Sequence, residues 1–243
     1  MTYQLYYWPT IQGRGEFIRL ALEEAGAAYV DVARGDKNKG EGVPALMAVM
    51  NRPSQAPFAP PFLKDGDLIV SQVANILEHL GPKLGLAPKD AALARFAHGL
   101  QLTIADLVVE AHDTHHPISV SSYYDEQKDA AKVRAADFIK SRIPKYLGYF
   151  EGVTAHNPAK SGYAVGADLT YVDLSLFQVI EGLTYAFPRA MADFAKTYPT
   201  LAALRDRVAQ RPNIARYLAS ERRIPFNESG IFRHYPELDR PAG

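Results

Sequence analysis

Two different patterns of hydrophobic and polar positions divide the chain. Up to residue 82, short apolar runs alternate with helical stretches, whereas strand-like runs almost disappear after residue 90. Short apolar runs bounded by turn residues are typical of strands, and apolar residues spaced by three and four are typical of helices. The pattern therefore predicts an α/β domain at residues 1–82, an all-α domain at residues 90–222 and a C-terminal tail at residues 223–243.

The first domain is predicted to have the order β-α-β-α-β-β-α. Residues 3–8 are rich in aromatic side chains and stop at Pro9, which is typical of a strand ended by a proline. Residues 15–25 have helical spacing, and Gly26 supplies a C-terminal cap. The other predicted elements are a strand at 28–32, a loop at 34–60 with a short helix at 45–50, a hairpin of strands 61–63 and 68–70, and a helix at 73–80 that ends at Gly81–Pro82.

The second domain is predicted to be helical throughout. Pro144 should kink or break one of its helices. Thr170 and Asp173 form a capping box, with Leu169 and Leu174 at the hydrophobic-staple positions, so a helix should begin there. The predicted helices span residues 91–111, 124–153, 171–185, 190–196 and 201–219.

Composition narrows the class of protein without identifying a reaction. Hydrophobic residues make up 47% of the chain, and Lys plus Arg equals Asp plus Glu at 27 each, so the basic surface expected of a nucleic-acid-binding protein is missing. Cysteine is absent, which excludes disulfides and thiolate nucleophiles. Neither a signal peptide nor an apolar run of about 20 residues is evident, so we expect a soluble, cytoplasmic protein without a membrane partner.

A candidate anion site surrounds the predicted hairpin. Pro60–Pro61 opens its first strand and is a good candidate for a cis peptide. The helix after Ser71–Gln72 would point its N-terminal N–H groups and positive dipole end in a similar direction, which favours a carboxylate. The alternative is a simple turn followed by an N-cap serine.

A second candidate lies at the end of the first strand, where Tyr6, Tyr7 and Trp8 are adjacent. Alternation directs the two tyrosines to opposite faces of the strand, and strand ends of α/β domains commonly bind ligands. A phenol at this place could donate to an anion or could simply fill the core, and the spacing leaves both interpretations open.

Histidines form a third cluster at the end of the helix predicted at 91–111. His112 and His116, four residues apart, could bind a metal with Glu110 nearby, and Asp113 and His115 lie between them. No further ligand spacing supports a metal, and histidines near a helix C-terminus are stabilised by the helix dipole alone. We therefore expect no metal site.

In their order along the chain, these motifs resemble those of cytosolic glutathione transferases, over residues 3–220. The segment from Tyr7 to Leu20 resembles the opening of the tyrosine-type classes (Mu, Pi and Sigma), with one extra residue between Pro9 and Gly13. Residues 61–67 resemble the family's cis-proline segment, 72–80 its Gln-Ser helix start, and 169–173 the capping box and staple of its sixth helix.

The resemblance implies a thioredoxin-like domain that binds glutathione and an all-helical domain with a hydrophobic substrate pocket. Tyr7 would donate its hydroxyl to the sulfur of glutathione and stabilise the thiolate. Glutathione would be the co-substrate, without a metal. The chain would form a homodimer in which Asp106 or Glu110 of one copy approaches the γ-glutamyl amine in the other. The residues implied to contact glutathione are Trp8, Arg14, Arg52, Pro60, Pro61, Ser71, Gln72 and Val73.

Two positions depart from the family's pattern. Val73 stands where the family has Ser or Thr, so a hydroxyl contact to the γ-glutamyl carboxylate is missing, and Ser71 is a candidate to replace it. Pro60 has no N–H to donate to the cysteinyl carbonyl. Together they are expected to weaken binding by about 1–3 kcal/mol if nothing compensates.

Two functions are compatible with these residues. The leading hypothesis is an enzyme that adds glutathione to a small hydrophobic electrophile, or uses it to reduce or isomerise one, as the retained Tyr7 suggests. The alternative is a non-catalytic binding or scaffold protein with the same fold, which Val73 and Pro60 favour. Tyr123, Tyr124 and residues 226–235 are candidates to line or cover the pocket, although packing is the commoner role of such aromatic residues.

Overall fold

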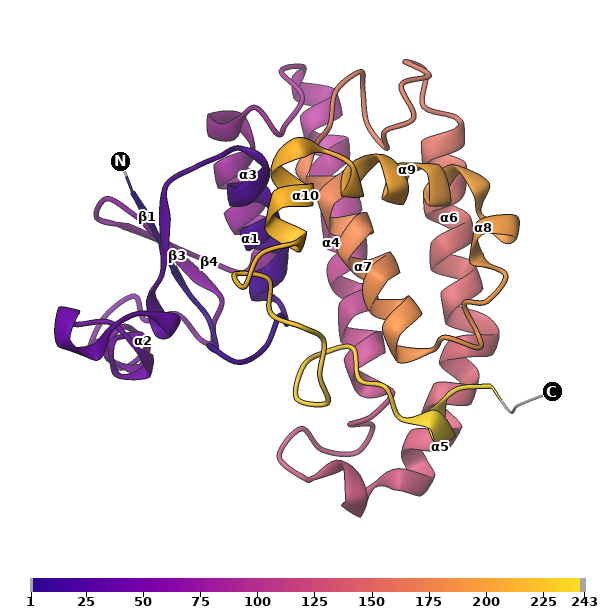
Figure 1. The fold of residues 1–243 in the computed structure, drawn as a ribbon, viewed down its shortest axis with the longest axis horizontal. Coiled ribbons are helices and arrows are strands. Elements are labelled where there is room, and N and C mark those ends of the chain that lie inside the picture. The colour runs from indigo at the N-terminus through magenta and orange to yellow at the C-terminus, as the bar shows by residue number, and fades with distance from the viewer. Residues whose placement is uncertain (1, 241–243) are drawn as a thin grey trace.

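A mixed four-stranded sheet forms the centre of the N-terminal domain in the computed structural model, which describes residues 2–240 (Figure 1). Strand β1 runs parallel to β2 and antiparallel to β3, and β3 and β4 form a hairpin. The order across the sheet is β2-β1-β3-β4, with β1 at Tyr3–Tyr6, β2 at Tyr29–Asp31, β3 at Phe62–Asp65 and β4 at Leu68–Ser71.

Alternation along β1 gives the sheet two hydrophobic faces. Leu5 packs in a cluster with residues of α1 (Gly15–Glu24) and α3 (Val73–Leu84). Tyr6 belongs to a second cluster that includes Leu46 of α2 (Val43–Met50). Figure 1 shows α1 and α3 between the sheet and the helical domain, with α2 on the outer side. This confirms the predicted thioredoxin-like α/β domain followed by an all-α domain.

The strand register brings three distant segments to one edge of the sheet. Tyr6 pairs with Phe62, and Phe62 pairs with Ser71, so these residues form one row across β1, β3 and β4. The residues one step beyond the row are Tyr7, Pro61 and Gln72.

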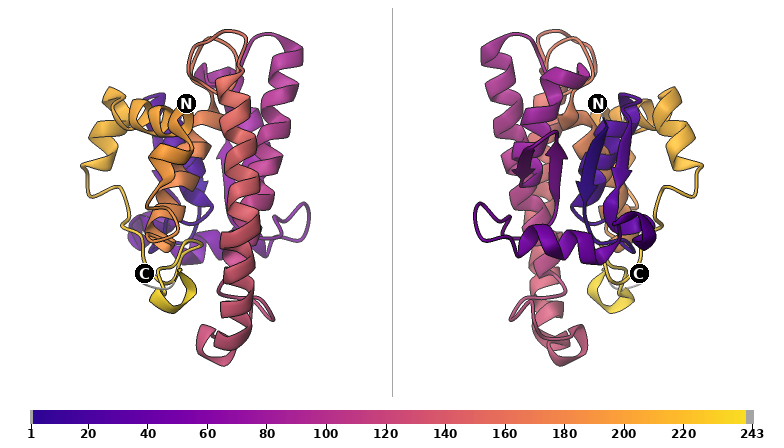
Figure 2. Two further views of the ribbon diagram at one scale, coloured as in Figure 1. Left: turned by 90° about the vertical axis from the view of Figure 1, so that its right-hand side faces the viewer. Right: turned by 90° about the vertical axis from the view of Figure 1, so that its left-hand side faces the viewer.

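The helical domain is built around the buried helix α7. This helix packs against α4 and α9 within the domain and against α1 of the first domain. Figure 2 shows α5 and α6 as one long column beside α4. The bounds of these helices are α4, Ala91–Asp113; α5, Lys128–Asp137; α6, Ile143–Ala155; α7, Tyr171–Ala186; α8, Phe194–Thr197; α9, Pro199–Ala209; and α10, Pro212–Leu218.

The predicted capping box begins α7. The Asp173 carboxylate accepts hydrogen bonds from the N–H groups of Thr170 and Ala164, both at 2.7 Å. Leu169 and Leu174, at the staple positions, are both buried in the core of the helical domain. The sequence prediction is confirmed, and Asp173 also fixes the preceding loop through Ala164.

Three predicted helices differ from the observed ones, and two of these differences lie at prolines. The helix predicted at 201–219 is interrupted after Ala209, because Pro212 starts a new helix, where its missing N–H costs nothing. Pro82, predicted to end α3, lies inside it, and the helix continues to Leu84 with Gly85 as its left-handed cap at φ 69°. The helix predicted at 190–196 is mostly turn, with a short helix only at Phe194–Thr197.

Pro144, expected to kink or break its helix, marks a change of helix type and no interruption, since helical residues run without a gap from Lys128 to Ala155. A π-helical turn at Phe138–Arg142 separates α5 from α6, and Pro144 lies in the first turn of α6. The loop predicted at 34–60 contains a short 3-10 turn at Lys37–Lys39 and α2, which begins two residues earlier than expected. Another 3-10 turn, at Val32–Arg34, leads into it.

Helix α4 has the length and mean hydropathy of a membrane span, 1.2 over its most apolar 18-residue window. Its Glu110 forms an ion pair with Arg142 beside α6, and its buried face packs against α3 and α7. In the fold, α4 is therefore a helix of the bundle with one apolar face directed inward.

The C-terminal tail crosses from the first domain to the far end of the second (Figure 1). Asn227 donates to the Thr10 carbonyl at 3.0 Å, and Asp239 accepts from the Arg189 N–H at 2.7 Å. Between these bonds, Ile231 and Phe232 are buried in the core of the helical domain. Segment 226–235 therefore packs against the helices, and its expected role in covering the pocket stays a prediction.

Candidate functional site

Tyr7 lies immediately beyond β1 and is held by the loop that follows it. Its phenolic oxygen accepts a hydrogen bond from the backbone N–H of Arg14 at 2.8 Å. The side chain is buried, with 4% of its surface exposed. Within residues 2–240 its own proton has no acceptor, so the hydroxyl is free to donate to a bound ligand.

Glycines on both sides of Arg14 make this geometry possible. A β-carbon at Gly13 would lie 2.1 Å from the Tyr7 oxygen, and Gly13 also has a φ of 46°. Only a residue without a side chain lets the loop pass this close to the ring. The glycines at positions 13 and 15 therefore allow the loop to pass close around the phenol ring.

Burial keeps the hydroxyl of Tyr7 protonated. Burial raises the pKa of Tyr7 above its usual value, while the backbone N–H of Arg14 and the charges of Arg14 and Arg19 act in the opposite direction. The Arg19 guanidinium lies 5.8 Å from the centre of the tyrosine ring. A phenol that stays protonated but receives these positive contacts is a good hydrogen-bond donor to an anion.

Tyr6 is engaged on the other face of the sheet. Its hydroxyl donates to Gln4 at 2.9 Å, and its ring stacks on Phe62 with the ring centres 4.7 Å apart. Tyr6 therefore contributes to packing, whereas Tyr7 keeps a free donor.

The hairpin and the start of α3 form the opposite side of the site. The Pro60–Pro61 peptide is cis, as the sequence analysis expected. Gln72 precedes α3 with a φ of 71°, in a region that non-glycine residues rarely adopt. Among residues 2–240 no side chain caps α3, so its first N–H groups stay available for a carboxylate. Ser71 contributes its carbonyl to Asn75, at 3.1 Å.

A cavity of about 300 Å³ lies between the start of α3 and α4. Arg14, Gln72 and Val73 line one side of it, and Leu102 and Val109 of α4 lie on the other. The structure thus brings three of the residues implied to contact glutathione to one cavity.

Trp8 and Arg52, two further residues implied to contact glutathione, lie around this edge of the sheet and differ in their contacts. Trp8 follows Tyr7 and is 37% exposed. Arg52 follows α2, and its guanidinium Nε donates to the Gln55 carbonyl at 2.9 Å, which folds the loop before the hairpin.

The two acidic candidates on α4 differ in their contacts. Glu110 accepts hydrogen bonds from Arg142 at 2.7 and 2.8 Å and from the Tyr146 hydroxyl at 2.8 Å. The Arg142 bonds hold the pKa of Glu110 below its usual value. Asp106 is exposed and has no ion-pair partner within residues 2–240. Glu110 therefore belongs to a network within its own domain, and Asp106 is the better candidate to meet a ligand of a second copy.

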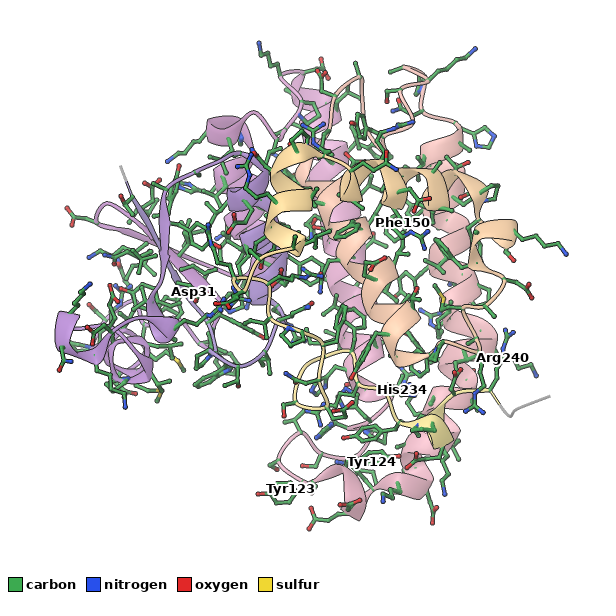
Figure 3. All side chains as sticks on the ribbon, viewed as in Figure 1. Asp31, Tyr123, Tyr124, Phe150, His234 and Arg240 are labelled. Carbon is green, nitrogen blue, oxygen red and sulfur yellow. The ribbon has the colours of Figure 1, made fainter. Side chains whose placement is uncertain are left out.

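A network of buried ion pairs on α1 supports the loop that contacts Tyr7. Arg19 and Glu16, both fully buried on α1, form an ion pair at 3.2 Å. Arg19 also pairs with Asp31 of β2 at 2.7 Å, at the place labelled in Figure 3. Glu16 accepts from the Tyr217 hydroxyl at 2.6 Å and pairs with Arg223 of the tail. The network ties both domains to the helix that follows Arg14.

Gln12 connects the same loop to the helical domain. Its side-chain amide donates to the Ile224 carbonyl of the tail at 2.5 Å, and Gln178 of α7 donates to its oxygen at 2.8 Å. The loop that presents Arg14 to Tyr7 is thus fixed by α7 and the tail.

The sequence analysis did not identify this network as part of the site. The one local signal was the pair Glu16 and Arg19, three residues apart on a helix whose other residues are mostly apolar. Their partners Tyr217 and Arg223 lie some 200 residues away, so spacing along the chain could not reveal them.

Comparison with known proteins gives a consistent family. Residues 112–221 match the family model described as "Glutathione S-transferase, C-terminal domain". The chain is 26% identical to a glutathione S-transferase of Plasmodium falciparum, over 90% of this chain and 95% of that protein. It is 27% identical to glutathione S-transferase P of Bos taurus, over 94% of this chain and 98% of that protein.

A solved structure shares the whole fold. The Pi-class glutathione S-transferase of Onchocerca volvulus superposes with a TM-score of 0.67 and 24% sequence identity, covering 90% of this chain and 92% of the other. Matches that span both domains, in a protein whose α/β domain precedes a helical domain, support a cytosolic glutathione transferase.

Proposed function

We propose that this protein is a glutathione transferase that conjugates the thiolate of glutathione to small hydrophobic electrophiles, with Tyr7 as its catalytic residue. The observation that carries the proposal is the Tyr7 hydroxyl, which accepts from the Arg14 N–H at 2.8 Å and keeps its own proton for the sulfur. A hydrogen bond received by the phenolic oxygen polarises its O–H group and strengthens the bond that it donates.

The energy required is within reach of this arrangement. A free thiol has a pKa near 8.5, so lowering it to neutrality takes about two units, or roughly 3 kcal/mol. A hydrogen bond to a charged group contributes about 1.5–3 kcal/mol. Tyr7 is buried, so water competes little for its proton.

The peptide would lie along the sheet edge that holds Tyr7, Pro61 and Gln72. The N–H groups at the start of α3 and the Gln72 side chain would receive the γ-glutamyl end. Val73 lacks the hydroxyl of the family pattern, but its backbone N–H is among the uncapped donors, and Ser71 precedes it. Pro60 would contribute its carbonyl to the cysteinyl N–H.

The other proposed contacts follow from the positions of charged and aromatic side chains. Arg14 lines the cavity beside Gln72, and Trp8 follows Tyr7 at the partly exposed end of β1. Arg52 would approach the glycine carboxylate, because its loop leads into the cis-proline segment.

The electrophile is proposed to approach the sulfur between the loop after Tyr7 and the C-terminal tail. Asn227 ties the tail to the Thr10 carbonyl at this boundary, and the neighbouring Phe226 stacks on Tyr185 of α7. An apolar wall of this kind would select small hydrophobic electrophiles. A cytoplasmic location is in keeping with the absence of cysteine from the sequence.

We further propose a homodimer with α4 in its interface. Large apolar residues are exposed along this helix, among them Phe96, Leu102 and Val109, which are 46–49% exposed. Asp106 lies four residues after Leu102 and therefore on the same face. In a dimer through this face, Asp106 of one copy would approach the glutathione site of the other.

The proposal is tested by calorimetric titration with glutathione, followed by a conjugation assay with a chromogenic aryl halide. Glutathione should bind and raise the melting temperature, as any ligand of the native state does. Binding without conjugation would favour a binding or scaffold protein, and an unchanged melting curve at millimolar glutathione would contradict the proposal.

A further inference from the structure

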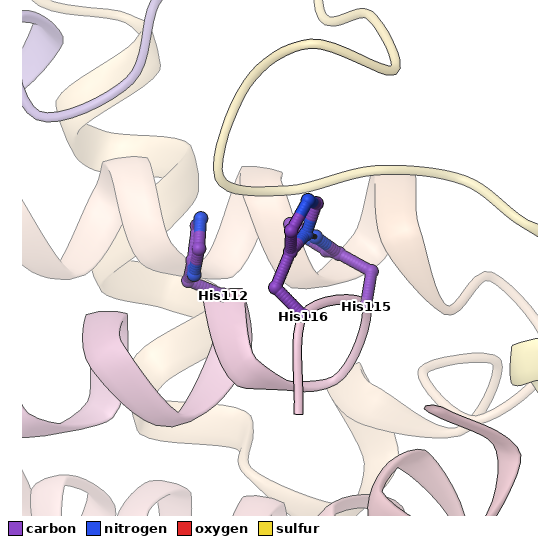
Figure 4. Close-up of side chains that lie close together, drawn as sticks. All are labelled: His112, His115 and His116. Carbon is purple, nitrogen blue, oxygen red and sulfur yellow. Dashed lines mark hydrogen bonds between the residues drawn. The ribbon is translucent and has the colours of Figure 1, made fainter. Parts of the chain in front are cut away.

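Three imidazoles that the proposed reaction does not use converge at the end of α4 (Figure 4). His112 lies in the last turn of the helix, and His115 and His116 lie in the turn that follows. Their ring centres are 4.8 to 5.1 Å apart, so the rings form a nearly equilateral triangle. One nitrogen of each ring lies within 4.8 Å of a nitrogen of the other two.

A hydrogen bond to the tail fixes the tautomer of His115. Its Nε2 lies 2.7 Å from the Ile231 carbonyl, which can only accept, so Nε2 carries the proton and Nδ1 bears a lone pair. This Nδ1 lies 2.5 Å from Nδ1 of His116. A histidine that donates one ring N–H to a backbone carbonyl and presents its other nitrogen is oriented as metal-ligating histidines are.

We propose that His112, His115 and His116 bind a divalent transition-metal ion, with Zn²⁺ as the best match. Three neutral imidazoles are a ligand set that Zn²⁺ accepts, with a fourth position left for water, whereas Mg²⁺ and Ca²⁺ require oxygen ligands. Two imidazole nitrogens on one Zn²⁺ are separated by about 3.3 Å, from bonds of roughly 2.0–2.1 Å in tetrahedral geometry. To reach that distance, the Nδ1 atoms of His115 and His116 need to separate by less than about 1 Å, and ligand atoms as far apart as 4.8 Å need to approach each other by about 1.5 Å.

The surroundings allow this small movement and the entry of an ion. His115 is 1% exposed and held by the tail, whereas His116 is only partly buried and can rotate. His116 also lines a cavity of about 590 Å³ between the loop at 120–125 and the tail. Tyr124 stacks on Tyr235 of the tail at this place, and Figure 3 labels Tyr124. An ion could therefore reach the cluster from the cavity.

Charged groups around the cluster set the expected affinity. Burial, followed by the charges of neighbouring groups, lowers the pKa of all three histidines. Asp113 supplies a negative charge, with a carboxylate oxygen 3.8 Å from Nδ1 of His112. Arg14 and Arg233 add positive charge nearby and should weaken binding relative to a site without them. Glu110, which the sequence pattern placed near a metal, is engaged by Arg142 instead.

The test is a titration of the full chain, free of any histidine tag, with Co²⁺, whose visible absorption reports tetrahedral nitrogen ligation. One Co²⁺ per chain should bind, Zn²⁺ should displace it, and Mg²⁺ should not. His112→Gln and His116→Gln should each weaken Co²⁺ binding by roughly tenfold or more. These two variants are preferred to a change at His115, which is buried and holds the tail.

His156→Gln is the matched control, because His156 is exposed at the end of α6 and bonds only within its own helix, to the Gly152 carbonyl. It should bind Co²⁺ as the unmodified chain does. Absence of the Co²⁺ spectrum at a large excess of metal, or unchanged affinity in both His112→Gln and His116→Gln, would overturn the proposal. None of these outcomes depends on glutathione, so they test the metal site separately from the proposed transferase activity.

Discussion

Gly15 lies so close to Tyr7 that a β-carbon at this position would be 2.6 Å from two carbon atoms of the tyrosine ring. No residue with a side chain fits there unless the ring moves. The absence of a side chain at Gly15 therefore lets the ring lie where the Arg14 N–H reaches its oxygen.

Gly15→Ala should displace Tyr7 and separate its oxygen from the Arg14 N–H. We expect the kcat/KM of conjugation to fall at least tenfold, about 1.4 kcal/mol in the barrier, and overpacking to cost about 1–3 kcal/mol of stability. Steady-state kinetics and denaturant unfolding measure the two effects.

Gly148→Ala is the control, since a β-carbon there meets nothing within 4 Å on an exposed helical position. It should keep full activity and gain about 0.5–1 kcal/mol of stability, and equal behaviour of the two variants would contradict the steric account.

Gln72 stores backbone strain at the proposed glutathione site. Its φ of 71° costs a non-glycine residue about 1–3 kcal/mol. Glycine adopts this angle without strain, so Gln72→Gly should keep or raise the melting temperature while it weakens glutathione binding by about tenfold, because a hydrogen-bonding side chain is lost. Calorimetric titration and thermal unfolding give the two values.

Lys160→Gly is the matched control for Gln72. Lys160 also has a positive φ, 50°, but lies in the loop after α6. The control should relieve strain in the same way and leave the affinity for glutathione unchanged. If Gln72→Gly also binds glutathione normally, this residue does not hold the γ-glutamyl end.

The carboxyl of Asp173 provides a pH dependence with a defined sign. Burial raises its pKa to about 6 in the folded protein, against about 4 in an unfolded chain. The folded state therefore binds more protons between about pH 4 and pH 6, so this group lowers the stability as the pH rises through that window, with no further change above it. The carboxyl ¹³C resonance of Asp173 should titrate with a midpoint near pH 6. A midpoint near 4 would contradict the burial argument.

The proposed dimer interface predicts the mass of the protein in solution, and it predicts that one variant has half of that mass. The chain has a mass of 26.8 kDa, so light scattering should give twice this value at micromolar concentration. Val109→Arg places a charge on the exposed face of α4 and should yield monomers. Val133→Arg, on the exposed surface of α5, is the control and should remain dimeric. A single-chain mass for the unmodified protein would refute the dimer.

The sequence predicts those features of the fold that are encoded locally. The capping box at Thr170 and Asp173 fixes the start of α7, and Pro144 lies directly after the π-helical turn before α6, because each acts on its own turn of helix. Pro82 shows the limit of this reasoning. Its position near the end of α3 loses one hydrogen bond, and the packing of the helix against α1 and α4 outweighs that loss.

The candidate site is predictable from the sequence only through the order of its motifs. Tyr7, Pro61 and Gln72 each lie one residue beyond the row that Tyr6, Phe62 and Ser71 form across the sheet, and no pattern along the chain specifies that register. The support of Gln12 by Gln178 and the tail depends on contacts across more than 160 residues. The convergence of His115 with His112 likewise depends on the turn after α4 and on Ile231.

The central claim is that the Tyr7 hydroxyl stabilises the thiolate of glutathione. The most direct test is a pH titration of the thiolate absorbance of bound glutathione. It is carried out on the unmodified chain, Tyr7→Phe and Tyr6→Phe. In Tyr7→Phe the pKa of the bound thiol should rise by about one unit or more, at least about 1.4 kcal/mol, with little change in affinity because the ring still packs. Tyr6→Phe loses only the bond to Gln4 and should match the unmodified chain. An unchanged thiol pKa in Tyr7→Phe, or a rise in Tyr6→Phe instead, would contradict the claim.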